Sequence, residues 1–121
     1  MKENVLGKKA YGFALRTVNL STFLCERKEF VLSKQVLRSG TSIGANIEES
    51  VHAQSKADFI HKLSIAQKEA CETHYWVRLL KHSGYLTNKL AESLLVDCEE
   101  IQKLLTASIK TAKSNLRKRS R

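Results

Sequence analysis

The chain contains no proline and only five glycines among its 121 residues. Both residue types interrupt helices, so their scarcity excludes a protein rich in turns and favours an all-α domain with short connections. No apolar run approaches the roughly 20 residues that cross a bilayer. The N-terminus also lacks the apolar core of a signal peptide, so we expect a cytoplasmic protein with no membrane partner.

Cysteine is scarce as well. Cys25, Cys71 and Cys98 are odd in number and widely spaced, which argues against a disulfide framework. They fall on or beside apolar stripes, where a free cysteine acts as a small hydrophobic residue. A chain of this length is expected to form one domain with a single core.

Acidic residues are missing from the end of the chain. The net charge is +9, and six cations that follow residue 109 leave only +3 for residues 1–109. These six are the candidate nucleic-acid-binding residues: Lys110, Lys113, Arg117, Lys118, Arg119 and Arg121. Clustered cations attract phosphates whatever the base sequence, and no aromatic residue lies among them to stack on bases. Alternatively, they only favour the helix C-terminus and solubility.

Apolar periodicity predicts four helices, at about residues 3–27, 31–54, 56–83 and 87–115. Short connections make sequential helices antiparallel neighbours, so residues 1–116 should form an up-down-up-down four-helix bundle. We expect fraying between Ala112 and Leu116 and a basic tail at 117–121. Ser55 with Asp58 predicts a capping box, Gly84 a left-handed helix stop, and Thr87 the cap of the last helix.

Residues 38–50, RSGTSIGANIEES, are the centre of this prediction. One stripe runs through them at helical spacing: Val36, Gly40, Ile43, Gly44, Ile47 and Val51. Small residues on a buried stripe let a second backbone approach closely, which offsets their poor helix propensity. The alternative is a Gly/Ser loop between two shorter helices.

The first helix has two adjacent apolar stripes. The first comprises Leu6, Ala10, Phe13, Thr17, Leu20 and Leu24, and the second comprises Tyr11, Leu15, Val18, Thr22 and Cys25. So wide an apolar face indicates either deep burial within the chain's own bundle or contact with another subunit. We therefore take Tyr11 and Leu15 as candidate oligomer contacts.

Tyr75 and Trp76 cannot both face the core, because adjacent helical residues lie about 100° apart. At least one is a candidate subunit contact, since aromatic residues are enriched at interfaces. The alternative is a half-exposed aromatic residue lying on its own surface.

The segment from Ser42 to Leu86 resembles the four-helix-bundle proteins encoded in 23S ribosomal RNA intervening sequences. The matching residues are Ser42-Ile43, Ala45-Asn46-Ile47, Glu49, Ala53-Gln54-Ser55-Lys56, Asp58-Phe59-Ile60, Leu63-Ser64-Ile65-Ala66, Glu69-Ala70, Glu72, Trp76, Leu79-Leu80 and Gly84-Tyr85-Leu86. Ser50 departs from the pattern, because many members have glycine there. The resemblance implies a homo-oligomer, commonly a pentamer, and a relationship to the basic accessory protein of diversity-generating retroelements, which works with nucleic acid.

The resemblance also marks Asn46, Glu49, Glu69 and Glu72 as part of the family pattern. We expect Asn46 to be partly buried and to need hydrogen-bond partners. One hypothesis is a polar cluster between the second and third helices, with Arg38 or Lys68 supplying positive charge. The alternative is that the glutamates are solvated.

Catalytic patterns are weak in this sequence. A di-iron bundle needs two Glu-x-x-His pairs, and only Glu49 with His52 provides one. Cys71 and His74 share a helix face without an orienting partner, and no phosphate-binding glycine loop is present. We expect no enzyme activity, metal or cofactor.

The sequence and its family resemblance therefore predict a non-enzymatic, homo-oligomeric protein that binds nucleic acid by charge and shape, and the resemblance implies that the oligomer is a homopentamer. RNA is favoured slightly over DNA. The alternative is a protein-interaction scaffold with no nucleic-acid ligand.

Overall fold

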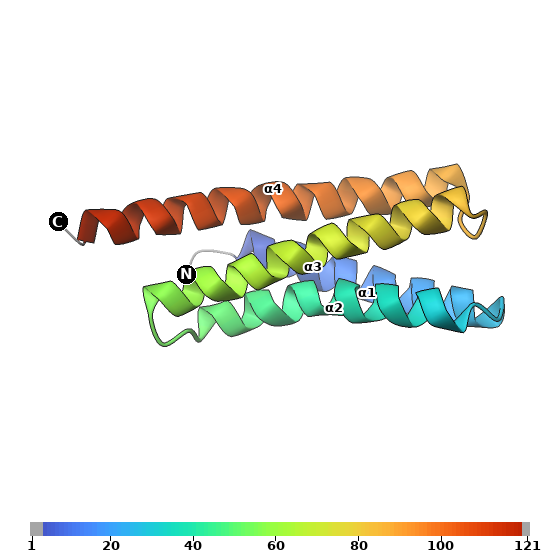
Figure 1. Cartoon of the computed structure of the whole chain (residues 1–121), viewed down its shortest axis with the longest axis horizontal. Helices are drawn as coiled ribbons and strands as arrows, with labels where there is room; N and C mark the ends of the chain where they lie inside the picture. The colour runs from blue at the N-terminus through green and yellow to red at the C-terminus, as the bar shows by residue number, and fades with distance from the viewer. Residues whose placement is uncertain (1–3, 120–121) are drawn as a thin grey trace.

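The computed structural model describes residues 4–119, which form four antiparallel helices (Figure 1). They are α1 (Val5–Glu26), α2 (Phe30–Val51), α3 (Lys56–His82) and α4 (Asn88–Arg119). The predicted up-down-up-down bundle is confirmed, and no strand occurs within the described residues. None of the helices within residues 4–119 combines the length and apolar composition that a bilayer span requires.

The predicted signals mark the helix ends. Ser55 Oγ accepts a hydrogen bond from the Asp58 N–H at 3.0 Å, while Asp58 Oδ2 accepts one from the Gln54 N–H at 3.3 Å. Gly84 has φ of +87°, the left-handed conformation that ends a helix without a Cβ penalty. Thr87 Oγ1 accepts from a backbone N–H in the first turn of α4 at 3.2 Å. These caps keep the connections short.

The centre of α2 is a continuous, buried helix and not a loop. Val36 and Ile43 are fully buried, and Ile47 is nearly so. The predicted burial of Val51 is wrong, because this residue is exposed at the last position of α2. Ser50 takes the buried place, and its Oγ donates to the Ile47 carbonyl oxygen at 2.6 Å. A serine can be buried there because its hydroxyl is satisfied within the helix.

At Gly40 the helices α1 and α2 approach too closely for a side chain on α2. A Cβ added to Gly40 would lie 2.4 Å from Thr17 Cγ2, inside the contact limit, whereas one added to Gly44 would lie 3.5 Å from the Ala10 carbonyl oxygen. Thr17 is itself fully buried. The prediction that small residues permit a close approach is therefore right, but of the two glycines in α2 only Gly40 has no room for a Cβ.

The helix α4 extends further than predicted. Its 32 residues form a rod of about 48 Å, and it continues to Arg119 where we expected fraying between Ala112 and Leu116. Ala112 is buried and Leu116 half-buried, so the apolar stripe continues at helical spacing without a glycine or proline to stop it. Figure 1 shows this C-terminal segment of α4 projecting beyond the other helices.

The α1–α4 seam is the least closely packed of the bundle. It is held by two ion pairs, Lys9 Nζ to Glu100 Oε1 at 2.7 Å and Arg16 Nη1 to Asp97 Oδ2 at 2.6 Å. Because α1 begins at Val5, it runs alongside only the first half of α4, and the distal half packs on α3. Ion pairs at the surface contribute little to stability, so the closer packing between α3 and α4 does more to hold α4 in place.

Replacing Gly40 tests the close approach. We expect Gly40→Ala to destabilise the fold by about 1–3 kcal/mol, because the new methyl group would overlap Thr17. Gly44→Ala, the matched control, should be neutral or stabilising by up to about 1 kcal/mol, the gain in helix propensity. Urea unfolding measures both. Equal stabilities for the two variants would contradict the packing described here.

Candidate functional site

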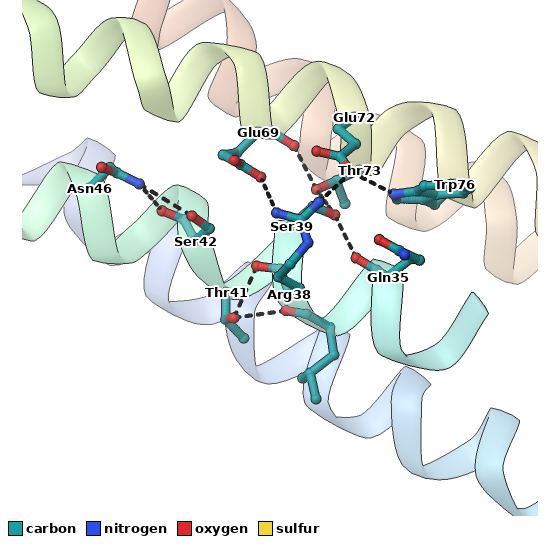
Figure 2. Close-up of polar contacts among 11 residues, drawn as sticks. Gln35, Arg38, Ser39, Thr41, Ser42, Asn46, Glu69, Glu72, Thr73 and Trp76 are labelled. Carbon is teal, nitrogen blue, oxygen red and sulfur yellow. Dashed lines mark hydrogen bonds and ion pairs between the residues drawn. The ribbon is translucent and has the colours of Figure 1, made fainter. Parts of the chain in front are cut away.

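Arg38 on α2 reaches across to two carboxylates of α3 (Figure 2). Its Nη1 donates to Glu69 Oε2 at 3.3 Å, and its Nη2 donates to Glu72 Oε1. Trp76 Nε1 also donates to Glu72 Oε1, at 3.3 Å. We call Arg38, Glu69, Glu72 and Trp76 the Arg38 cluster. It joins two helices and orients the tryptophan, as the cluster hypothesis anticipated for Arg38 and the two glutamates.

The charges of the Arg38 cluster reinforce one another. The hydrogen bond from Arg38 is the main cause that lowers the pKa of Glu72, and partial burial of the carboxylate opposes this shift. The hydrogen bond from Trp76 and the positive charge of Arg38 lower the pKa of Glu72 further. The hydrogen bond to Glu72 likewise raises the pKa of Arg38. Since half of the Arg38 side chain is exposed, we expect the cluster to fix the register of α2 and α3 more than to add stability.

Two buried hydroxyl groups lie near this cluster, and the sequence did not reveal them. Ser39 Oγ and Thr73 Oγ1 are hydrogen-bonded at 2.9 Å, and both residues are fully buried or nearly so. Ser39 also donates to the Gln35 carbonyl oxygen at 3.1 Å, which Figure 2 shows. Nothing in the sequence indicates that a serine of α2 and a threonine of α3 will form a hydrogen bond with each other.

The prediction that Asn46 and Glu49 belong to the same cluster is wrong. Asn46 is half-buried as expected, but its Nδ2 donates within α2, to the Ser42 carbonyl oxygen at 2.9 Å and to Ser42 Oγ at 3.2 Å. Glu49 forms a separate, exposed ion pair with Lys62 Nζ at 3.1 Å. Lys68 is exposed outside the cluster. The amide of Asn46 is satisfied one turn back, so it needs no partner on α3.

The second stripe of α1 is exposed within this chain, which excludes deep burial in its own bundle. Tyr11 is 69% exposed, Leu15 51% and Val18 44%. A groove between α1 and α2 runs beside this stripe, lined by Gly7, Tyr11, Ala14, Thr41, Gly44, Ala45 and Glu48. We call Tyr11, Leu15 and Val18 the α1 apolar stripe. The side chains of the α1 apolar stripe are not part of the hydrophobic core of the bundle.

The two adjacent aromatic residues of α3 point in different directions, as predicted. Trp76 packs against the core and hydrogen-bonds to Glu72, whereas Tyr75 is 51% exposed. Their rings meet edge-on, with centroids 5.2 Å apart. Of this pair, Tyr75 is the residue available for contact with a partner.

The predicted basic residues do not all lie together. Lys110, Lys113 and Arg117 line one groove between α3 and α4, together with Gln67, Thr106 and Ile109. Lys118 is exposed, and its place on the helical wheel turns it away from this groove. The side chain of Arg119 and the whole of Arg121 lie outside what the structure describes. Lys103, seven residues before Lys110, shares the groove side of α4 and was missed because it lies among apolar residues.

A comparison with models of known protein families identifies the family of this chain. The family model described as 23S rRNA-intervening sequence protein matches residues 2–107. The chain belongs to this family. One solved structure of similar fold is a protein with unknown function from the S23 ribosomal protein family, from Bacteroides thetaiotaomicron, in a crystal structure at 1.70 Å. The two proteins are 58% identical in sequence and their structures align with a TM-score of 0.86. The alignment covers 88% of this chain and 99% of the Bacteroides chain. No curated protein matches the chain.

Within residues 4–119 of this intervening sequence protein, no three His, Cys, Asp or Glu side chains are placed to hold a metal ion. His74 Nε2 instead pairs with Glu99 Oε2 at 2.8 Å, and Cys71 Sγ accepts from Gln102 Nε2 at 3.5 Å. Cys98 is fully buried, which raises the pKa of its thiol to about 12. A thiol with that pKa is not a nucleophile at neutral pH.

Replacing Glu72 by glutamine tests the Arg38 cluster through pH. Because folding lowers the pKa of Glu72 below its ordinary value of 4.5, its stabilisation is present above that value and is lost as the pH falls further. We expect Glu72→Gln to cost about 0.2–1 kcal/mol at pH 7 and nothing at acidic pH, measured by urea unfolding.

The control for this experiment is the Arg38→Gln background. Without the guanidinium, Glu72→Gln should have little effect at either pH, because the interaction it removes is already gone. A cost that is the same at pH 7 and at pH 3, or that survives in the Arg38→Gln background, would contradict the assigned cause.

Proposed function

We propose that this protein is a non-enzymatic homo-oligomer that binds nucleic acid, RNA or DNA, by charge and shape. The observation that carries the proposal is the charge of the distal half of α4. After Glu100 the sequence has no acidic residue, and Lys110, Lys113 and Arg117 line one groove. Such a surface attracts a phosphate backbone through counterion release, whatever the base sequence.

The α1 apolar stripe supports the homo-oligomeric part of the proposal. Exposed apolar side chains that lie next to one another mark interaction surfaces. The small residues Ala14, Gly44 and Ala45 in the adjacent groove would let a helix of a second subunit approach closely. A pentamer is the assembly that the resemblance to other family members implies. Several basic segments on one assembly would strengthen weak phosphate contacts by avidity.

A protein-interaction scaffold is the second candidate. It is favoured by a different exposed apolar pair on α3, Tyr75 and Leu79, which lies apart from the basic segment. In this case the cations would serve solubility, and a partner protein would dock on the bundle.

Salt dependence separates the two candidates. We expect the full-length chain to bind a generic RNA or DNA, with an affinity that falls steeply between 50 and 200 mM salt. Removing residues 115–121 deletes four cations and should weaken binding at low salt by at least about tenfold. Fluorescence anisotropy measures both effects. A full-length chain that binds neither RNA nor DNA at 50 mM salt would favour the scaffold.

The assembly is tested by placing a charge on the α1 apolar stripe. We expect Leu15→Glu to reduce the particle to the 13.7 kDa of one chain while leaving it helical, because Leu15 contributes little to its own core. Val96→Glu is the matched control, since Val96 on α4 is 59% exposed. Light scattering after size exclusion gives the masses. A wild-type chain that is already monomeric would refute the assembly.

A further inference from the structure

We infer that the basic side of α4 binds the backbone of a nucleic-acid duplex in preference to a single strand. The surface consists of Lys103, Lys110, Lys113 and Arg117, and we call it the α4 basic strip. This inference rests on the proposed function and makes it more specific, because it names the form of nucleic acid and the residues that contact it.

The spacing of the α4 basic strip places its charges in a row. Steps of seven, three and four residues keep all four side chains on one side of a helix. From Lys103 to Arg117 the strip covers about 21 Å at 1.5 Å per residue. This stretch of α4 is regular helix throughout, so the row is straight and its charges keep their spacing.

The described residues that line the groove beside the strip include no carboxylate. Gln67 and Thr106 lie at its α3 edge and bond to each other, with Gln67 Nε2 donating to Thr106 Oγ1 at 2.6 Å. The last two acidic residues of α4 are Glu99, one turn before Lys103 and hydrogen-bonded to His74, and Glu100, which is paired with Lys9. From Lys103 to Arg117 the helix itself carries no carboxylate.

A duplex suits this surface better than a single strand for two reasons. First, a straight row of cations gains most from the densest row of phosphates, and a duplex carries one charge per about 1.7 Å of axis against about 3.4 Å for each strand. Second, proteins that hold single strands stack the bases on aromatic side chains. The residues that line this groove include no aromatic side chain.

The projecting end of α4 makes the strip accessible. Lys56 at the start of α3 lies level with Asn115, since both line the groove on the other side of α4. The last turn of α4 therefore extends past α3, and α1 does not reach this half of α4 (Figure 1). The strip is therefore bordered by α3 on one side, at Gln67, and its last cation, Arg117, lies beyond the start of α3.

The test compares two triple variants of the full-length chain. Lys110→Gln, Lys113→Gln and Arg117→Gln together remove three charges from the strip. Lys28→Gln, Lys34→Gln and Lys89→Gln remove three exposed charges from the α1–α2 connection and from the beginnings of α2 and α4. These segments lie at the end of the bundle opposite the C-terminus of α4 (Figure 1). The probes are a 20-base-pair RNA duplex, a DNA duplex of the same sequence, and the corresponding single strands, measured by anisotropy over a salt series.

We expect wild type to bind the duplexes at least about fivefold more tightly than the single strands at 0.1 M salt. The strip variant should lose about 30-fold or more in duplex affinity, with a salt slope shallower by about 2 to 3. The control variant should keep both the affinity and the slope within about twofold. Circular dichroism and the melting temperature should match wild type for both variants.

Other outcomes separate this inference from the proposed function. Equal binding of duplex and single strand, or equal losses in the two variants, would overturn the inference while leaving nucleic-acid binding in place. No binding of any probe at low salt would overturn both.

Discussion

The bundle depends on how closely α1 and α2 approach at Gly40. At that point a methyl group would overlap the buried Thr17, so the two backbones are as near as the side chains allow. Ile43 and Ile47, one and two turns further along α2, are buried in the core. On the other side of α2, Ser39 and Thr73 meet in a buried hydrogen bond, and Arg38 pairs with the carboxylates of α3. Together these contacts join α1, α2 and α3 around the middle of α2.

The helix α4 has fewer neighbours than the other three helices along its distal half. The residues that stabilise the bundle are therefore different from the residues that we propose bind nucleic acid. The first half of α4 packs on α3 and is tied to α1 by two ion pairs, while its distal half lacks α1 as a neighbour. The cations Lys110, Lys113 and Arg117 repel one another, and the exposed distal half of α4 tolerates this repulsion better than a compact region of the bundle would. The α1 apolar stripe lies on a different helix, so self-association and phosphate binding would use separate surfaces of the bundle.

The sequence predicts the fold well because each helix carries its own signals. Ile43 and Ile47 keep helical phase, Ser55 with Asp58 marks a start, and Gly84 marks a stop. The candidate sites were only partly predictable, since they depend on which residues meet across helices. Asn46 and Glu49 have the right residue types for the Arg38 cluster but find other partners. The chain's periodicity could not show that α1 is too short to cover α4.

Amide hydrogen exchange of the full-length chain, with and without an RNA duplex, tests the central claim most directly. The account predicts the slowest exchange around Ile43 and Ile47 in both samples, because these amides open only when the bundle unfolds. Adding the duplex should slow exchange along residues 103–118 and leave α1 and α2 unchanged. Slowing confined to α1 and α2, or the greatest protection in the distal half of α4, would contradict it.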